Sequence, residues 1–171
     1  MQINVMKLDP NAKLPTRGSE YAAGWDLYAL NSEIIEPGEC KLIHTGLALE
    51  IPDGYFGAIY ARSGLATKQG LRPANCVGVI DSDYRGEVCV ALRNDNPAGE
   101  FRNYPVGHID GTTGVCREEF VSNHSACKYI SAGDRVAQLI IQKFDNVEFV
   151  ESAELSTTDR GEGGFGSTGT K

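Results

Sequence analysis

The sequence predicts an all-β fold in a single domain, and three observations carry this prediction. Proline and glycine recur about every ten residues, with short β-branched and aromatic runs between them. No helical period extends over a long segment of the chain. The 171 residues, 41% of them hydrophobic, suffice for one buried core and leave no need for a second.

Alternating apolar residues mark the strands that we expect. Apolar residues alternate along 47–51, a Pro-Asp-Gly turn follows at 52–54, and 55–60 form the returning strand. We therefore predict a hairpin at this place. Further core strands are predicted at 88–92 and 136–144, where the sequence alternates or runs apolar over a strand's length.

One short helix is expected immediately after Arg62. Ser63 can cap a turn or two through its hydroxyl, and Gly70 provides the stop signal.

Two segments fall outside the strand pattern. Residues 98–126 keep no clear period and indicate a long insertion in a domain that spans 1–155. Residues 156–171 turn to glycine, serine, threonine and charge, so they cannot form a core of their own. This arm is either disordered or a mobile functional segment.

Charge and cysteine usage restrict the class of protein. A net charge of -7 disfavours sequence-independent binding to nucleic acid, because such binding requires a basic surface. No run of 18 apolar residues is present, so we expect no membrane span. Five cysteines without a C-x-x-C pair fit reduced thiols, and we expect a cytoplasmic protein.

Three segments concentrate chemistry. Residues 81–86 gather two carboxylates, a hydroxyl, a phenol and a guanidinium before a predicted strand. An ordinary Asp-rich β-turn would have a similar sequence. Arg62, Ser63 and Gly64 offer groups that bind phosphate oxygens. The tail at 160–169 could wrap a phosphate and stack a base, or serve as a flexible linker.

Together with residues 23–27 and 133–138, these segments resemble, in order and spacing, the five motifs of the trimeric dUTPase family. The run from Gly78 to Gly86 and the tail are the most specific of the matches. The resemblance implies a jelly-roll-type β-barrel and hydrolysis of dUTP to dUMP and pyrophosphate with Mg²⁺. Such an activity limits uracil entry into DNA and supplies dUMP for dTMP synthesis.

The resemblance also implies roles for individual residues. Asp81 would orient and deprotonate the attacking water, as a general base. Tyr84 would pack against the deoxyribose. The uracil would be read by a hairpin between Leu71 and Tyr84, through Asn75, Gly78, Val79 and Ile80.

The phosphates would be held by residues of other motifs. These are Arg62, Ser63, Gly64 and Gln138, with a closing arm formed by Arg160, Phe165, Gly166, Ser167 and Thr168. Asp26 would reach the metal through water, or serve instead as a structural partner of Arg135. In the family each active site is built from three chains, so the resemblance implies a homotrimer.

Two other functions stay open at this level. A related dCTP deaminase would share the fold and bind a pyrimidine triphosphate. A regulatory protein would bind a protein partner through the 98–126 insert and respond to nucleotide.

The insert also raises a metal hypothesis. His108, Cys116, His124 and Cys127 lie close in sequence and could form a tetrahedral zinc site. A plain surface loop, available for subunit or partner contacts, is the interpretation that we favour.

Overall fold

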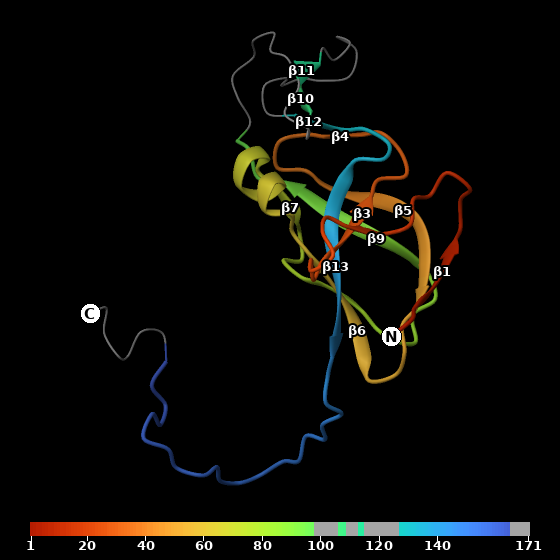
Figure 1. The fold of residues 1–171 in the computed structure, drawn as a ribbon. Coiled ribbons are helices and arrows are strands. Elements are labelled where there is room, and N and C mark those ends of the chain that lie inside the picture. The colour runs from red at the N-terminus through yellow and green to blue at the C-terminus, as the bar shows by residue number, and fades with distance from the viewer. Residues whose placement is uncertain (98–105, 109–112, 115–126, 165–171) are drawn as a thin grey trace.

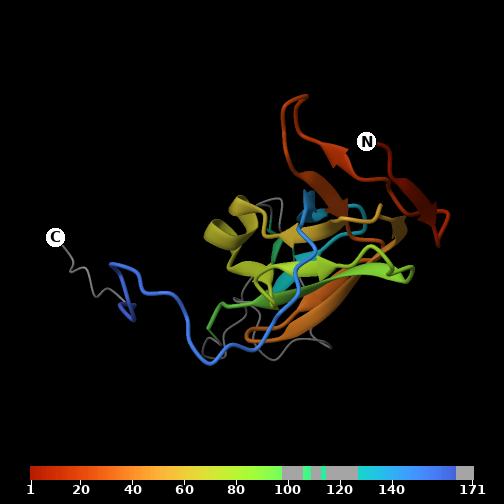
Figure 2. The same cartoon turned by 90° about the horizontal axis from the view of Figure 1, so that it is seen from below.

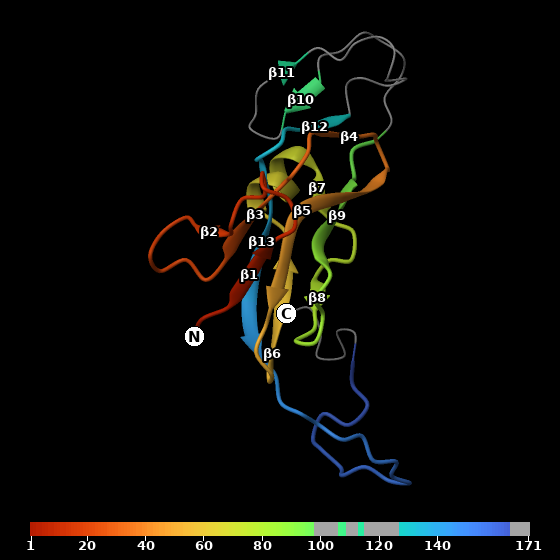
Figure 3. The ribbon, with the colours of Figure 1, turned by 90° about the vertical axis from the view of Figure 1, so that its right-hand side faces the viewer.

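The structure is a computed structural model that describes residues 1–97, 106–108, 113–114 and 127–164 (Figure 1). Almost all of its regular structure is β-strand, which confirms the all-β prediction. Two larger sheets pack face to face as a jelly-roll-type fold, and a third, smaller sheet lies at one end (Figure 3). The three sheets remain separate ladders over the described chain and do not close into one continuous barrel.

The first large sheet is antiparallel throughout. Its longest pairing joins β5 to β9, with a bulge in β5 between His44 and Ala48. In spatial order its strands are β1 (Asn4–Lys7), β5 (Cys40–Glu50), β9 (Glu87–Asn94) and β7 (Leu71–Pro73).

The second large sheet is also antiparallel and is centred on β13, which pairs on both sides. Its strands, in order, are β2 (Thr16–Arg17), β3 (Trp25–Tyr28), β13 (Arg135–Lys143), β6 (Tyr55–Tyr60) and β8 (Gly78–Ile80). Strands β9 and β13 therefore confirm the predictions for 88–92 and 136–144.

The third sheet lies at the end of the molecule opposite to the point where the C-terminal arm leaves (Figures 1 and 3). Its order is β11 (Thr113–Gly114), β10 (Val106–His108), β12 (Lys128–Ile130) and β4 (Glu33–Ile35). The described parts of the 98–126 insert, β10 and β11, thus extend a sheet that β12 and β4 begin.

The core lies between the two large sheets. Strands of the first sheet contribute Ile43 and Leu92, and strands of the second contribute Leu27 and Leu139, all of them 4% exposed or less. Truncating one such side chain to alanine costs about 2–5 kcal/mol, so the sandwich depends on this layer.

The predicted hairpin at 47–60 is wrong. Strand β5 pairs with β1 and β9, and β6 pairs with β13 and β8, so both edges of each strand are already occupied. The turn at Pro52, whose carbonyl accepts the Tyr55 N–H at 3.2 Å, carries the chain from one sheet to the other. A two-sheet sandwich needs such a corner, and the turn residues of a corner resemble those of a hairpin.

The predicted short helix is present as η1 (Leu65–Gln69), a single π-helical turn. Gly70 ends it in the left-handed conformation, with φ 67°, as expected. The expected cap is wrong, because the N-cap position is Gly64, one residue after Ser63, and no side chain caps the helix.

After β13 the chain leaves the sheets. Residues 144–164 run away from the sandwich, as the view from below shows (Figure 2). Among the residues that the structure describes, no helix combines the length and apolar character needed to cross a membrane.

Candidate active site

A cleft of about 360 Å³ lies between β8 and the outer face of β9. It brings together six of the residues that the sequence singled out, and they come from one continuous segment of the chain. These are Asn75, Gly78, Val79, Ile80, Asp81 and Tyr84. The cleft therefore brings together the residues predicted for the pyrimidine and sugar side of the site.

A tight turn joins two residues that line this cleft, Asn75 and Gly78. The Val77 N–H donates to Asn75 O at 2.7 Å, and Cys76 adopts φ 62°, which turns the chain sharply. A Cβ on Gly78 would lie 3.2 Å from Ile59 Cβ and 3.3 Å from Asn75 Nδ2, so glycine allows this close approach.

The segment from Leu71 to Tyr84 is not the laddered hairpin that the resemblance implied. Strand β7 pairs with β9 in the first sheet, whereas β8 pairs with β6 in the second. The turn around Cys76 therefore bridges the two sheets, because each flanking strand finds its partner elsewhere.

Asp81 and Tyr84 stand together after β8. The Tyr84 N–H donates to Asp81 O at 3.2 Å, and the Tyr84 hydroxyl donates to Glu87 O at 3.0 Å. A Cβ on Gly86 would lie 2.6 Å from Tyr84 Cζ, so the ring packs directly across this glycine. The ring is held in place while the Asp81 carboxylate stays exposed, as a base that must reach water requires.

A second cluster joins β3 to β13 and the start of η1. The buried Asp26 carboxylate lies 3.4 Å from Arg62 Nε and 3.2 Å from Arg135 Nη1, and Arg62 Nη1 donates to Arg135 O at 2.9 Å. Gln138 is the register partner of Asp26, and a Cβ on Gly24 would lie 3.2 Å from the Gln138 side chain. This cluster unites residues of three separate predicted motifs.

The geometry of Asp26 bears on the predicted metal contact. Its Oδ2 accepts from Arg135, which is the structural alternative considered from the sequence. Its buried Oδ1 has no hydrogen-bond partner among the described residues. Oδ1 faces Arg62 Nε at 3.4 Å, and two adjacent guanidinium groups repel a directly bound cation, so any contact of Asp26 with a metal would have to run through water.

The two clusters do not share a cleft within one chain. The cleft around Asp81 is lined by none of Arg62, Ser63, Gly64, Gln138 and Arg160. Ser63 and Gly64 lie exposed at the start of η1.

Arg160 is exposed on the arm, where its Nε donates to Gly163 O at 2.7 Å. The remaining predicted arm residues, Phe165, Gly166, Ser167 and Thr168, lie outside the described residues.

Two polar lining residues were missed by the sequence analysis. Glu87 and Cys89 contribute to the same cleft from β9. Their alternation with Val88 and Val90, which are buried, was the available signal, since it places them on the outer face.

The ionisation of these two residues is perturbed. Burial raises the pKa of the Cys89 thiol to about 11, and the nearby Glu87 carboxylate adds to this effect. Partial burial opposes ionisation of Glu87, but hydrogen bonds from His44 and Gly46 outweigh it and lower the pKa of the carboxyl group.

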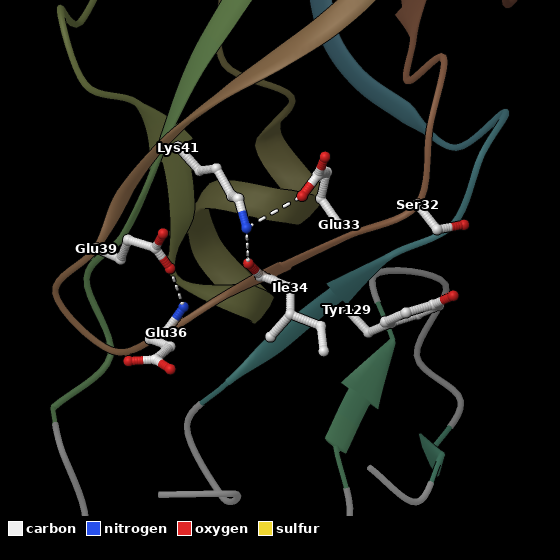
Figure 4. Close-up of a pocket in the computed structure, with 7 residues that line it drawn as sticks. All are labelled: Ser32, Glu33, Ile34, Glu36, Glu39, Lys41 and Tyr129. Carbon is white, nitrogen blue, oxygen red and sulfur yellow. Dashed lines mark hydrogen bonds and ion pairs between the residues drawn. The ribbon is translucent and has the colours of Figure 1, made fainter. Parts of the chain in front are cut away.

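A larger hollow, of about 630 Å³, lies beside β4 and β12 (Figure 4). Three carboxylates line it, and among the described residues Lys41 is its only lysine or arginine, paired with Glu33 at 3.0 Å. A surface of this charge repels a triphosphate, so the hollow does not suit the predicted substrate.

The zinc hypothesis for the insert is not tested by the structure. Cys116, His124 and the side chain of His108 lie outside what the structure describes, and Cys127 is buried.

Comparison with known proteins agrees with the motifs. The family model described as dUTPase matches residues 10–98 and 112–169. A deoxyuridine 5'-triphosphate nucleotidohydrolase of Nautilia profundicola is 41% identical over 169 residues, covering 99% of both chains. The corresponding protein of Thermobifida fusca is 37% identical, covering 99% of this chain and 79% of its own.

Solved structures agree as well. The dUTPase of Staphylococcus bacteriophage 80alpha with dUpNHpp superimposes with a TM-score of 0.88 at 31% identity, covering 98% of each chain. The dUTPase of the Staphylococcus aureus phage phi11, described with a species-specific insert, gives a TM-score of 0.83 at 29% identity and covers 92% of this chain and 100% of its own. The motifs, the jelly-roll-type fold and the family match lead to one conclusion: the chain belongs to the dUTPase family.

Proposed function

We propose that this protein hydrolyses dUTP to dUMP and pyrophosphate. The observation that carries the proposal is a cleft that gathers Asn75, Gly78, Val79 and Tyr84 beside the exposed carboxylate of Asp81. Its supports are the family membership and relatives named for this activity.

Recognition of the nucleoside follows from the close packing of the cleft. Backbone groups at Gly78 and Val79 and the Asn75 amide offer donors and acceptors to the uracil edge. The tight turn leaves little room for a methyl group at C5. Tyr84, braced by its bond to Glu87 O, lies against the deoxyribose and excludes a 2′-hydroxyl.

The chemical step assigns a base role to Asp81. Its carboxylate takes a proton from water, the water oxygen forms a bond to the α-phosphorus, and the bond to the bridging oxygen breaks. Pyrophosphate leaves with the electron pair. A positioned general base contributes about 10² to 10⁴ in rate.

The triphosphate requires local positive charge, because the chain as a whole carries -7. Four groups donate hydrogen bonds to the triphosphate: the Arg62 guanidinium, the Ser63 hydroxyl, the Gly64 N–H and the Gln138 amide. Arg160 of the arm adds a second guanidinium. Mg²⁺ bound to the triphosphate would neutralise phosphate charge, and Asp26 Oδ1 would meet it through a water molecule.

A complete site requires more than one chain. Within one chain the Asp81 cleft is lined by no residue of the Arg62 cluster. Three large apolar side chains between β13 and the arm are also exposed, Phe149 at 95%, Val150 at 79% and Leu155 at 88%. Apolar side chains of this size gain by burial against another copy, which supports a homotrimer in which each arm closes a neighbour's site.

The test is pyrophosphate release across the deoxynucleoside triphosphates and UTP. We expect rapid release from dUTP alone and no ammonia from dCTP. Ammonia production would support the deaminase alternative, and equal turnover of UTP would contradict the role of Tyr84.

A further inference from the structure

Three metal-ligating side chains meet on the outer face of the first sheet. His44 of β5 and Cys89 of β9 are direct register partners, and Glu87 precedes Cys89 by two residues on the same face. His44 Nδ1 lies 2.8 Å from Glu87 Oε2 and 3.5 Å from Cys89 Sγ.

The carboxylate of this trio is held in place by the bulge in β5. Glu87 Oε1 accepts the Gly46 N–H at 2.7 Å, and Gly46 has φ 69°, which directs that N–H outward. The second oxygen of the carboxylate is thereby turned toward His44. Such a supporting bond is what orients ligands in protein metal sites.

The spacing of the donors fits a tetrahedral ion. With metal bonds of about 2.3 Å to sulfur and about 2.0 Å to nitrogen, a tetrahedral angle places the two donors about 3.5 Å apart. The separation of Cys89 Sγ and His44 Nδ1 is 3.5 Å. His44 Nδ1 and Glu87 Oε2 lie 2.8 Å apart, which is a hydrogen-bond distance. To bind the same tetrahedral ion they need to separate by only a few tenths of an ångström.

We propose that His44, Glu87 and Cys89 bind one Zn²⁺ ion, or a similar borderline-soft divalent ion, with the fourth coordination position open. The donor set of nitrogen, oxygen and sulfur selects a borderline-soft metal and disfavours Mg²⁺, so this site is distinct from the one that serves the triphosphate.

The bound ion would clamp two neighbouring strands and reach the nucleotide cleft. His44 belongs to β5, while Glu87 and Cys89 belong to β9 and also line the cleft that holds Asp81. A cysteine binds a metal as the thiolate, so metal binding must displace the Cys89 thiol proton to the solvent. The site adds a metal-binding function that the hydrolysis does not require.

Cobalt provides the direct test. The purified full-length protein is stripped with a chelator and titrated with Co²⁺, and thiolate-to-cobalt charge transfer and bound metal per chain are measured. Zn²⁺ affinity is then obtained by competition. The same measurements are made on His44→Ala and Cys89→Ser, and on Cys40→Ser and Cys116→Ser as controls.

We expect one Co²⁺ per chain with a charge-transfer band in the wild type and in both cysteine controls. Cys89→Ser should lose the band, and His44→Ala should weaken binding by more than the roughly 10- to 100-fold typical of outer-sphere changes. Cys40 is a matched control because it is exposed on the same strand, β5, outside the trio.

Either of two results would overturn the proposal. One is the absence of stoichiometric binding by the wild type. The other is a band that survives His44→Ala and Cys89→Ser but disappears in Cys116→Ser, which would place the metal in the insert. If Cys89→Ser does not fold, His44→Ala decides the matter, because the His44 side chain is 48% exposed and its removal leaves the core intact.

Discussion

The cleft around Asp81 and the C-terminal segment 144–164, which includes the start of the arm, belong to the same proposed active site but are built in opposite ways. In the cleft, close packing at Gly78 and Gly86 determines where each group lies. Along the C-terminal segment, a Cβ on Gly164 would meet nothing within 4 Å, and Phe149 is 95% exposed. The difference shows that packing within its own chain shapes the cleft, whereas the C-terminal segment is largely exposed and has few such contacts.

The largest expected effect separates chemistry from binding in the cleft. Asp81→Asn should lower kcat by about 10² to 10⁴, because the amide keeps the shape of the carboxylate and loses its basicity. Binding of a non-hydrolysable dUTP analogue should stay close to that of the wild type. Pyrophosphate release and calorimetry measure the two quantities.

Asp83→Asn is the matched control, since Asp83 is exposed two residues away in the same turn. Equal turnover by Asp81→Asn and the wild type would remove Asp81 from the mechanism.

Truncation after Thr158 tests the arm. It should lower kcat/KM by about 10² to 10³, because it removes Arg160 from the phosphates and leaves the site open to water. The Tm and the oligomeric state should not change, since the deleted residues carry no part of the core. Full activity of the truncated protein, or loss of the trimer, would contradict the closing role.

Gly86→Ala compares the packing of the two regions directly. The added methyl group would collide with the Tyr84 ring, and overpacking of this kind costs about 1–3 kcal/mol. Gly164→Ala on the arm should leave the free energy of unfolding unchanged. Denaturant titration of both variants measures this contrast, and equal stabilities would show that the cleft is as adaptable as the arm.

Glu87→Gln should give a smaller effect that depends on pH. Because the folded protein lowers the pKa of Glu87, its ionised form stabilises the fold above the ordinary value of 4.5. That contribution is lost as the pH falls through the lowered pKa. The Tm difference between wild type and variant should therefore be present at pH 7 and shrink toward pH 3, and a constant difference would contradict this assignment.

The smallest effect is expected at the insert. Replacing residues 98–126 with a short turn should leave kcat for dUTP unchanged; within this insert the family model leaves 99–111 unmatched. The third sheet would keep its β12–β4 pairing, and it lies away from the arm (Figure 3). Loss of hydrolysis in a folded variant would make the insert part of the catalytic structure.

Much of the site could be predicted because its residues are close in sequence. Asn75, Gly78, Asp81 and Tyr84 lie within ten positions, and a turn of that length keeps them together in space. His44 could not be connected to Glu87 and Cys89 in this way. Their contact depends on the register of β5 against β9 and on a bulge, neither of which apolar alternation reveals.

The sequence by itself determined the all-β class, the strands β9 and β13, the short helix ended by Gly70 and the family to which the chain belongs. These features depend on local periodicity, turn chemistry and short motifs. Tertiary structure alone decided that β5 and β6 lie in different sheets and that the Asp81 cleft contains no residue of the Arg62 cluster. The physical reason is that a strand's partner is chosen by competition among all available edges, and residues far apart in the chain enter that competition on equal terms.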